Sequence, residues 1–408
     1  MTAGTTEGGA VSPAAIGRHR LHDGQLRVSR IDGNGVSKLY VGVLPDTDGN
    51  FDAQAGDLYR RLDHFLEDIG ARPCDVITER VFLSDLPEQA EGFRRIREEH
   101  YGGAGPERPC TSYLQQPPCR PGALVELQAR VIFARRPDEG LVVRDLSAPL
   151  GAGSAKVVSY RGYDHIYAHN ITGGEAGDGL AYGAQTESAF ERAENLLQGL
   201  GLSFRDVVRT WLYLDEMERD YDELNRVRNA FFERAGVERL PASTGIEGGV
   251  YPPDRGGCLD LYALRTEHPV QVETMHAASL NEAPAYGSRF SRGLVVTRDD
   301  RHIAYVSGTA SIDDQGQVVH VGDSEGQIHR MLHNVENLLA GSGATMGDIV
   351  RATTYLKDGG DYELYQGIWR AKGLPRDIPH TICRADVCRP DWLCEIEAVA
   401  IFPPRAAS

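Results

Sequence analysis

The apolar positions along the chain change repeatedly between two spacings. Short runs of alternating or continuous apolar residues predict β-strands, and stretches with apolar residues three and four positions apart predict amphipathic helices. The order of strand, helix, glycine turn, strand, second helix and closing strand occurs three times. The three copies run from Leu39 to Leu127, from Ile166 to Leu261 and from Ala304 to Glu397.

An Asp-Val or Asp-Ile pair marks the same point in every copy, directly after the first helix. The pairs begin at Asp75, Asp206 and Asp348, so the repeat lengths are 131 and 142 residues. Internal periodicity of this kind determines the architecture before any single motif does. We therefore predict an α+β protein of three tandem modules.

The module boundaries follow from where each repeat begins and ends. We place a disordered tail at 1–27, module 1 at 28–138, module 2 at 139–270 and module 3 at 271–408. The tail is rich in Gly, Ala, Thr and Ser and has neither the basic start nor the apolar stretch of a signal peptide.

The amino-acid composition is that of a globular protein without a membrane span. The hydrophobic content of 41% and charged content of 25% are ordinary for globular proteins. No apolar run approaches the roughly 18 residues that a membrane span needs. Seven cysteines without a signal segment are expected to be reduced thiols, so we predict a cytoplasmic protein without membrane attachment.

The formal net charge of −16 bears on possible partners. It argues against nucleic acid, and against an endoribonuclease, because phosphate binding needs a basic surface. A small anionic substrate remains compatible, since a basic pocket can lie within an acidic protein. No CxxC or HExxH motif is present, so we expect neither a metal site nor a cofactor.

The closing strand of the third copy, residues 394–400, contains two carboxylates. Glu395 and Glu397 alternate with apolar residues and therefore share one face of a strand that otherwise looks like core. One interpretation is an edge strand whose polar face lies in water. The other is a buried pair with a partner or a task, because burying a carboxylate is costly.

Three segments of the third copy carry a family resemblance: VSGTASID, GQIHRMLHNVENLLAGSGATMGDIVRATTYLKD and LCEIEAVAIF. With these motifs, residues 30–403 resemble the Rid family, also called YjgF or UK114. The resemblance implies chorismate-mutase-like modules, each a mixed β-sheet with two helices on one face. Three modules imply an intrachain pseudo-trimer, because three sheets around a common axis bury the open sheet faces. We expect a monomer of this kind or a low-order homo-oligomer.

Shorter segments of copies two and three carry a narrower resemblance. They are RTW at 209–211, PASTGI at 241–246, YGSR at 286–289, VHVGD at 319–323 and ADVC at 385–388. These segments resemble the chorismatases, which hydrolyse the enolpyruvyl ether of chorismate to pyruvate and a hydroxybenzoate or a dihydroxycyclohexadiene carboxylate. The resemblance implies that Glu395 is the catalytic acid and that cysteine at position 388 is associated with 3-hydroxybenzoate.

The chain also departs from the simple imine deaminases of the Rid family. Those proteins place an arginine fifteen residues before the first glutamate of the closing strand. Here the three equivalent positions are Thr111, Ser243 and His380, which cannot grip a carboxylate bidentately. In copy two the glutamate itself is replaced by Cys258, and Glu126 of copy one lacks a basic partner nearby in sequence. We therefore expect one competent pocket, in module 3.

The expected chemistry needs a general acid that keeps its proton near neutral pH. An enolpyruvyl ether hydrolyses once its methylene carbon is protonated, and burial raises the pKa of a carboxyl, so Glu395 suits this role. Cys388 is either a nucleophile, a determinant of pocket shape or an inert core residue. Gly308, in the VSGTA segment, is a further candidate for the site.

A dicarboxylate substrate also needs cations. Arg289 lies where simple Rid proteins have a pocket tyrosine, and the alternative is a surface arginine. Arg370 and Lys372 either clamp the second carboxylate or belong to a solvated helix end. Arg209 and Tyr213 share one strand face and are candidates to line the neighbouring pocket.

Three functions remain open at this point. The first is a cofactor-free, chorismatase-like enzyme of secondary metabolism that forms 3-hydroxybenzoate or a related acid. The second is a hydrolase, lyase or deaminase that acts on another enol ether, enamine or imine. The third is a non-catalytic Rid protein that binds a ligand.

Overall fold

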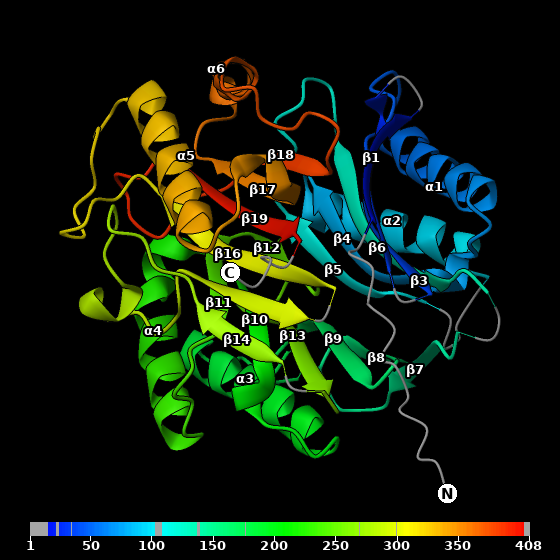
Figure 1. Ribbon diagram of the computed structural model, residues 1–408, viewed down its shortest axis with the longest axis horizontal. Helices are drawn as coiled ribbons and strands as arrows, with labels where there is room; N and C mark the ends of the chain where they lie inside the picture. Colours follow the sequence, from blue (N-terminus) through cyan, green and yellow to red (C-terminus); the bar gives the residue numbers. More distant parts are fainter. Residues whose placement is uncertain are drawn as a thin grey trace, which may run out of the picture.

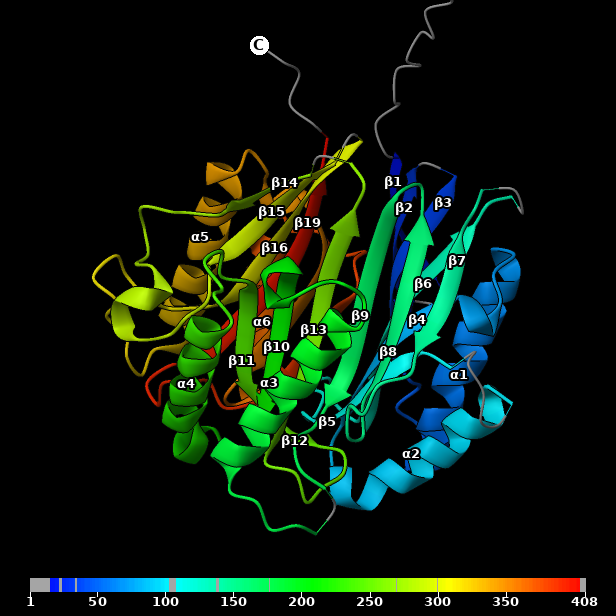
Figure 2. The ribbon, with the colours of Figure 1, turned by 90° about the horizontal axis from the view of Figure 1, so that it is seen from below.

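The computed structural model describes residues 15–21, 24–33, 35–102, 108–136, 139–175, 177–268, 270–298 and 300–403. Three β-sheets face a common centre, and the helices of each module cover the outer face of its sheet (Figures 1 and 2). The predicted α+β fold of three tandem modules is therefore confirmed. No helix in the described part of the chain is long and apolar enough to cross a lipid bilayer.

The first sheet has the spatial order β1-β2-β3-β6-β4-β5-β12. Its strands are β1 (Ala15–Leu21), β2 (Leu26–Gly33), β3 (Val36–Val43), β4 (Val76–Leu83), β5 (Cys110–Gln115), β6 (Val125–Ala134) and β12 (Gly249–Val250). The helices α1 (Phe51–Asp68) and α2 (Leu86–His100) pack on it. Only β4 and β5 are parallel neighbours, so the sheet is mixed.

The second sheet has the order β11-β10-β13-β9-β8-β7. Its strands are β7 (Val142–Leu146), β8 (Ser154–Tyr160), β9 (Tyr163–Ile171), β10 (Val207–Leu214), β11 (Ala242–Glu247) and β13 (Gly257–Thr266). The helices α3 (Tyr182–Gln198) and α4 (Met217–Arg234) cover its outer face.

The third sheet has the order β14-β15-β16-β19-β17-β18. Its strands are β14 (Gln271–Thr274), β15 (Gly293–Arg298), β16 (Arg301–Ala310), β17 (Ile349–Leu356), β18 (His380–Arg384) and β19 (Cys394–Phe402). The helices α5 (Ser324–Gly341) and α6 (Tyr362–Ala371) complete the module.

The three aspartates of the repeat have one structural role. Each carboxylate accepts a hydrogen bond, 2.8 Å long, from the backbone N–H three residues earlier, and so closes a short turn before the central strand of its module. Asp75, Asp206 and Asp348 thus cap the turns that feed β4, β10 and β17. This local need explains why the pair recurs in sequence.

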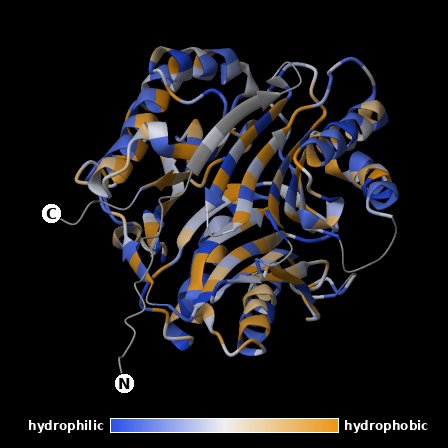
Figure 3. Cartoon of the chain, turned by 45° about the vertical axis from the view of Figure 1, so that its right-hand side comes forward, coloured by the Kyte–Doolittle hydropathy of each residue, from blue (hydrophilic) through white to orange (hydrophobic). Residues whose placement is uncertain are grey.

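The sheets meet at their edges. Strand β12, from the sequence of module 2, pairs with β5 of the first sheet. Isolated bridges join Ala242 to Ser291 and Pro118 to Cys383, which link sheets two and three and sheets three and one. Hydrophobic and hydrophilic positions are mixed along the strands (Figure 3), and the central strands β4, β10 and β17 are nevertheless buried along their whole length, so polar side chains are enclosed where the sheets meet.

The predicted module boundaries fall between the sheets, since β6 ends at Ala134 and β7 begins at Val142, and β13 ends at Thr266 and β14 begins at Gln271. The predicted tail is wrong for part of its length. Residues 15–21 form β1, which pairs along its whole length with β2. Backbone pairing holds this segment although its sequence has little apolar character; residues 1–14 lie outside the described part.

Candidate active site

The closing strands place one residue of each module at an equivalent position. Glu126, Cys258 and Glu395 pair with the seventh residue of the neighbouring central strand, which is Phe82, Tyr213 or Tyr355. Glu395 lies near Thr244 of module 2, and Glu126 lies near Thr381 of module 3. We call these two junctions between modules the Glu395 cleft and the Glu126 cleft.

Glu395 lies in the cleft between modules 2 and 3. It is 4% exposed, and its carboxyl oxygen Oε1 would lie only 2.0 Å from a Cβ atom at position 308. Gly308 therefore leaves the space that the carboxyl occupies. The Gly308 N–H donates to Thr244 Oγ1 at 3.1 Å, which holds β11 of module 2 against β16. Two residues predicted for the site, Gly308 and Glu395, thus lie side by side, and the binding role of Gly308 stays a prediction.

The protonation state of Glu395 follows from its surroundings. Burial, and then the negative charge of Glu397, raise the pKa of Glu395 to about 8, although Arg292 and Arg209 act in the opposite direction. No hydrogen bond or ion pair to its carboxyl is found among the described residues. Glu395 is thus largely neutral at pH 7, and its proton is not committed to another side chain.

Glu397, two residues further along the same strand face, is in the opposite state. Burial alone would raise its pKa, but Arg209, Arg351 and Arg80 hold the pKa below its usual value. The Arg209 and Arg351 guanidinium groups lie 2.7 and 3.1 Å from its carboxylate. The interpretation as an edge strand with its polar face in water is therefore wrong, because both glutamates are buried. One carboxyl holds a proton and the other holds a charge.

Trp211 and Thr244 complete the shell around Glu397. The indole Nε1–H donates to Oε2 at 2.6 Å, and the Thr244 hydroxyl donates to the same oxygen at 2.7 Å. These bonds, with the arginines, account for the stability of a charge in the protein interior. Glu397 is thereby fixed as the negative charge that helps to keep Glu395 protonated.

Cys388 lies beside Glu395, as predicted. Burial, and then the Glu395 charge, raise the pKa of the Cys388 thiol to about 12, and the Tyr221 hydroxyl is its hydrogen-bond partner. At neutral pH the residue is a thiol and not a thiolate, which disfavours the nucleophile interpretation. Cys388 contacts apolar clusters of both modules, which favours a role in pocket shape.

Module 2 contributes a polar group to the same cleft. Tyr221 and Asn225 lie one turn apart on α4, and both approach Ser288 of module 3, at 3.4 and 3.0 Å between side-chain oxygens. We did not identify Tyr221 and Asn225 from the sequence. The available signal was weak: two polar residues four apart on one helix, opposite the YGSR segment.

The cation beside Glu395 is Arg292, which the sequence analysis did not single out. Its side chain is 2% exposed, and its guanidinium donates to Asn281 through Nε (2.8 Å) and Nη2 (3.0 Å). The Arg292 charge acts on both Glu395 and Cys388. Arg289, three residues earlier, reaches the Val237 carbonyl at 3.5 Å, so its role in substrate binding stays a prediction.

Arg209 and Tyr213 are separated by the length of strand between them. Arg209 pairs with Glu397 and the Thr244 hydroxyl, and its Nη1 group is buried without a hydrogen-bond acceptor in the described part of the chain. Four residues on, Tyr213 pairs with Cys258, and Tyr355 takes the equivalent place opposite Glu395. The charge of Glu397 acts on both Arg209 and Tyr213, so the two side chains share this neighbour. Their role in lining a substrate pocket stays a prediction.

Arg370 and Lys372 lie at the end of α6, away from the Glu395 cleft. Arg370 lines a cavity of about 290 Å³ with His380 and Trp369, and Lys372 is exposed. Strands β18 and β19 flank β17 on opposite sides, so His380 and Glu395 face different neighbouring modules. A clamp of these two cations on a ligand at Glu395 is therefore wrong.

The cavity belongs to the cleft between modules 3 and 1, near Glu126. Burial raises the pKa of Glu126 to about 7, and the Arg27 and Arg120 charges and a hydrogen bond from Thr381 offset part of this rise. The expectation that Glu126 lacks a basic partner is therefore wrong. Arg27 belongs to β2, within the segment predicted as a tail, so tertiary pairing brings it to the cleft.

A metal centre is a separate question. In the described ranges, no three His, Cys, Asp or Glu side chains are grouped so that they could hold a metal ion.

Comparison with known proteins places this geometry in a family. The family model described as Endoribonuclease L-PSP matches residues 170–254 and 281–402, about half of the chain. The 3-aminoacrylate deaminase RutC of Acinetobacter baylyi is 32% identical over 100 residues, which are 24% of this chain and 79% of that protein.

One solved structure supports the fold by its superposition, and a second is similar over a single module's length. A chorismatase structure superposes with a TM-score of 0.58 at 16% identity and covers 80% of this chain and 93% of its own. An Entamoeba histolytica structure described as a putative endoribonuclease L-PSP has a TM-score of 0.29 at 20% identity, over 32% of this chain and all of its own. The chain belongs to the endoribonuclease L-PSP family, the Rid family that its repeats resemble.

Proposed function

We propose that the chain is a cofactor-independent, chorismatase-like enzyme whose active site is the Glu395 cleft. It cleaves the enolpyruvyl ether of chorismate to pyruvate and a hydroxybenzoate, in particular 3-hydroxybenzoate. The observation that carries the proposal is the neutral, unpaired Glu395 carboxyl, with a raised pKa of about 8, two residues from an ionised glutamate. The similarity of the fold to a chorismatase supports it.

Glu395 acts as the general acid in this proposal. It donates its proton to the methylene carbon of the enol ether, and the resulting cation is stabilised by the ether oxygen. Water then adds to the cation and returns a proton to the Glu395 carboxylate, and the resulting hemiketal collapses to pyruvate and the ring alcohol. Loss of the other ring hydroxyl as water makes the ring aromatic and gives the hydroxybenzoate. A carboxyl with a pKa near the working pH is suited to such a transfer, because it is protonated yet acidic enough to donate.

Two buried arginines, Arg292 and Arg209, act on the charge of Glu395. The Asn281 side chain and backbone hold the Arg292 guanidinium, whereas the Nη1 group of Arg209 lacks an acceptor in the described part of the chain. A substrate carboxylate would accept from this Nη1 group, lie within the field of Arg292 and place the enol ether near the acid. Local positive charge of this kind is compatible with the net charge of −16.

A second candidate is the hydrolysis of an enamine, and the similarity to a 3-aminoacrylate deaminase favours it. An enamine is also activated by protonation at carbon, so the same acid would serve. Against it stand Ser243 and His380, which occupy positions where simple Rid deaminases have arginine. Both proposed reactions begin with proton transfer from Glu395 to a carbon atom, and they differ in the substrate that is protonated.

The test is turnover of chorismate in deuterated water. Pyruvate should form and, after immediate reduction to lactate, carry one solvent deuterium in its methyl group, because the acid exchanges its proton with solvent. 3-Hydroxybenzoate should appear in equal amount. Absence of pyruvate from chorismate, with ammonia released from an enamine substrate, would replace the proposal with the second candidate.

A further inference from the structure

The centre of the molecule contains a group of arginines with too few carboxylates. The axial cluster, as we define it, consists of Arg80, Arg130, Arg209, Arg351, Asp260 and Glu397. The carboxylates pair with three of these arginines, since Asp260 lies 3.1 Å from Arg80 and Glu397 pairs with Arg209 and Arg351. Four positive charges thus face two negative charges.

Arg130 is the arginine without an acidic partner. Its guanidinium donates to the Tyr167 hydroxyl at 3.0 Å and lies over the rings of Tyr40 and Tyr167, at 4.5 and 5.1 Å from their centres. No ion pair between Arg130 and a carboxylate exists in the described part of the chain. Aromatic faces offset only part of the cost of burying a cation.

The nearby histidine does not supply a compensating charge. His169 contacts Asp260, but burial lowers the pKa of His169 to about 4, so it is neutral. The positive charges also act on one another: burial, and then Arg80, lower the pKa of Arg351 to about 10 despite the opposing effect of Glu397. An excess of buried positive charge of this size requires a counter-charge.

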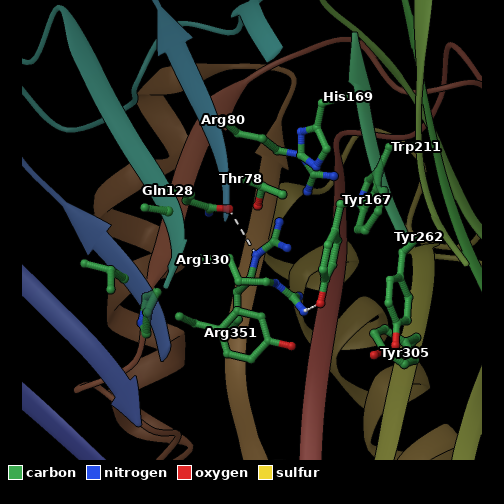
Figure 4. Close-up of a pocket in the computed structure, with 14 residues that line it drawn as sticks. Thr78, Arg80, Gln128, Arg130, Tyr167, His169, Trp211, Tyr262, Tyr305 and Arg351 are labelled. Carbon is green, nitrogen blue, oxygen red and sulfur yellow. Dashed lines mark hydrogen bonds between the residues drawn. The ribbon is translucent and has the colours of Figure 1, made fainter. Parts of the chain in front are cut away.

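A cavity lies where the guanidinium groups converge. It has a volume of about 30 Å³ and is lined by Arg80, Arg130 and Arg351 together with polar and tyrosine side chains (Figure 4). Since roughly 10–15 Å³ of such space holds one water molecule, the cavity accepts a small ion but excludes a substrate of chorismate size. Thr78 and Tyr305, which also line it, carry hydroxyls that can donate to an anion.

We propose that this axial cavity binds a monovalent anion of chloride size, which offsets part of the excess charge of the axial cluster. The cavity does not include Glu395, although the cluster around it shares Arg209 and Glu397 with the Glu395 cleft, and the proposal does not depend on the proposed reaction. A bound anion also explains how four arginines stay together at the centre with only Asp260 and Glu397 as acidic partners: guanidinium groups hold the ion, and its charge offsets theirs.

The test uses thermal unfolding of the whole chain at constant ionic strength. Sodium gluconate, whose anion is too large for the cavity, is replaced stepwise by sodium chloride or bromide. The unfolding temperature should rise and saturate with either halide. In crystals grown with bromide, anomalous scattering should place an ion within hydrogen-bond distance of the Arg130 guanidinium.

Two variants separate this site from general salt effects. Arg130→Met should lose the saturable response to halide, whereas Arg226→Gln, which changes an exposed arginine on α4, should keep it. No saturable response in the unaltered chain, or the same response in Arg130→Met, would overturn the proposal. If Arg130→Met does not fold, the bromide crystal decides: water alone in the cavity would refute the site.

Discussion

Replacing Glu395 by glutamine should stabilise the protein at pH 8 while removing its acid. Glu395 is 4% exposed, and its pKa is raised from 4.5 to about 8 by burial and by Glu397. A carboxyl whose pKa is raised by folding contributes stability below its unfolded pKa and loses that contribution as the pH rises through its folded pKa. Glutamine is neutral throughout and never meets this loss.

The size of this stability difference follows from the pKa of Glu395 in the unfolded chain, 4.5, and in the folded protein, about 8. Relative to the glutamine variant, the wild type should be less stable by about 1 kcal/mol at pH 5 and by about 4 kcal/mol at pH 8, and the difference should level off near 5 kcal/mol above that pH. Packing differences between glutamate and glutamine are nearly independent of pH. The change between the two pH values, about 3 kcal/mol, therefore reports the pKa itself.

The assay is urea unfolding of wild type and Glu395→Gln at both pH values, followed by far-UV circular dichroism and tryptophan fluorescence. Glu336→Gln, an exposed change in the middle of α5, is the matched control and should show no such difference. If the two proteins differ by the same amount at pH 5 and pH 8, Glu395 titrates normally. The general-acid argument then loses its physical basis.

Four further substitutions test the cleft around Glu395. Cys388→Ala should change the ratio of aromatic products more than the rate, because the neutral thiol shapes the pocket; an unaltered ratio in chromatography would reduce Cys388 to packing. Arg292→Gln should weaken substrate binding by roughly 1.5–3 kcal/mol, and Arg289→Ala by less; the reverse order of KM values would return the binding role to Arg289. Gly308→Ala should lower kcat at least tenfold with little loss of secondary structure, because a Cβ would lie 2.0 Å from Glu395 Oε1; full activity would show that the carboxyl can move.

The turnover rate should also depend on pH in a defined direction. Because the acid must be protonated, kcat should be constant below about pH 7 and should fall as the pH rises through about 8, the pKa of Glu395. A rate that rises over this range would indicate a general base instead.

The fold was accessible from sequence because its signals are local. Helical and strand periodicity, repeated three times, and the aspartates that cap the turns before β4, β10 and β17 each act within a few residues. The shared face of Glu395 and Glu397 likewise follows from the two-residue period of a strand. These features need no knowledge of what lies opposite.

The partners of Glu395 were not accessible in the same way. Tyr221 and Asn225 come from another module, and Arg292 looks like any arginine at the start of a strand. Arg27 belongs to β2, which pairs with β1 and β3, and this pairing brings it near Glu126 of another strand. Such contacts depend on how the modules pack against one another, and the local sequence pattern does not predict this packing.

The central claim is tested most directly by comparing three proteins on chorismate: wild type, Glu395→Gln and Glu126→Gln. The last changes the equivalent carboxyl of another cleft and serves as the matched control. Wild type and Glu126→Gln should release pyruvate at similar rates, and Glu395→Gln should be slower by about 10²–10⁴-fold, the usual contribution of a general acid. Retained activity in Glu395→Gln, or its loss in Glu126→Gln alone, would contradict the assignment of the active site to the cleft between modules 2 and 3.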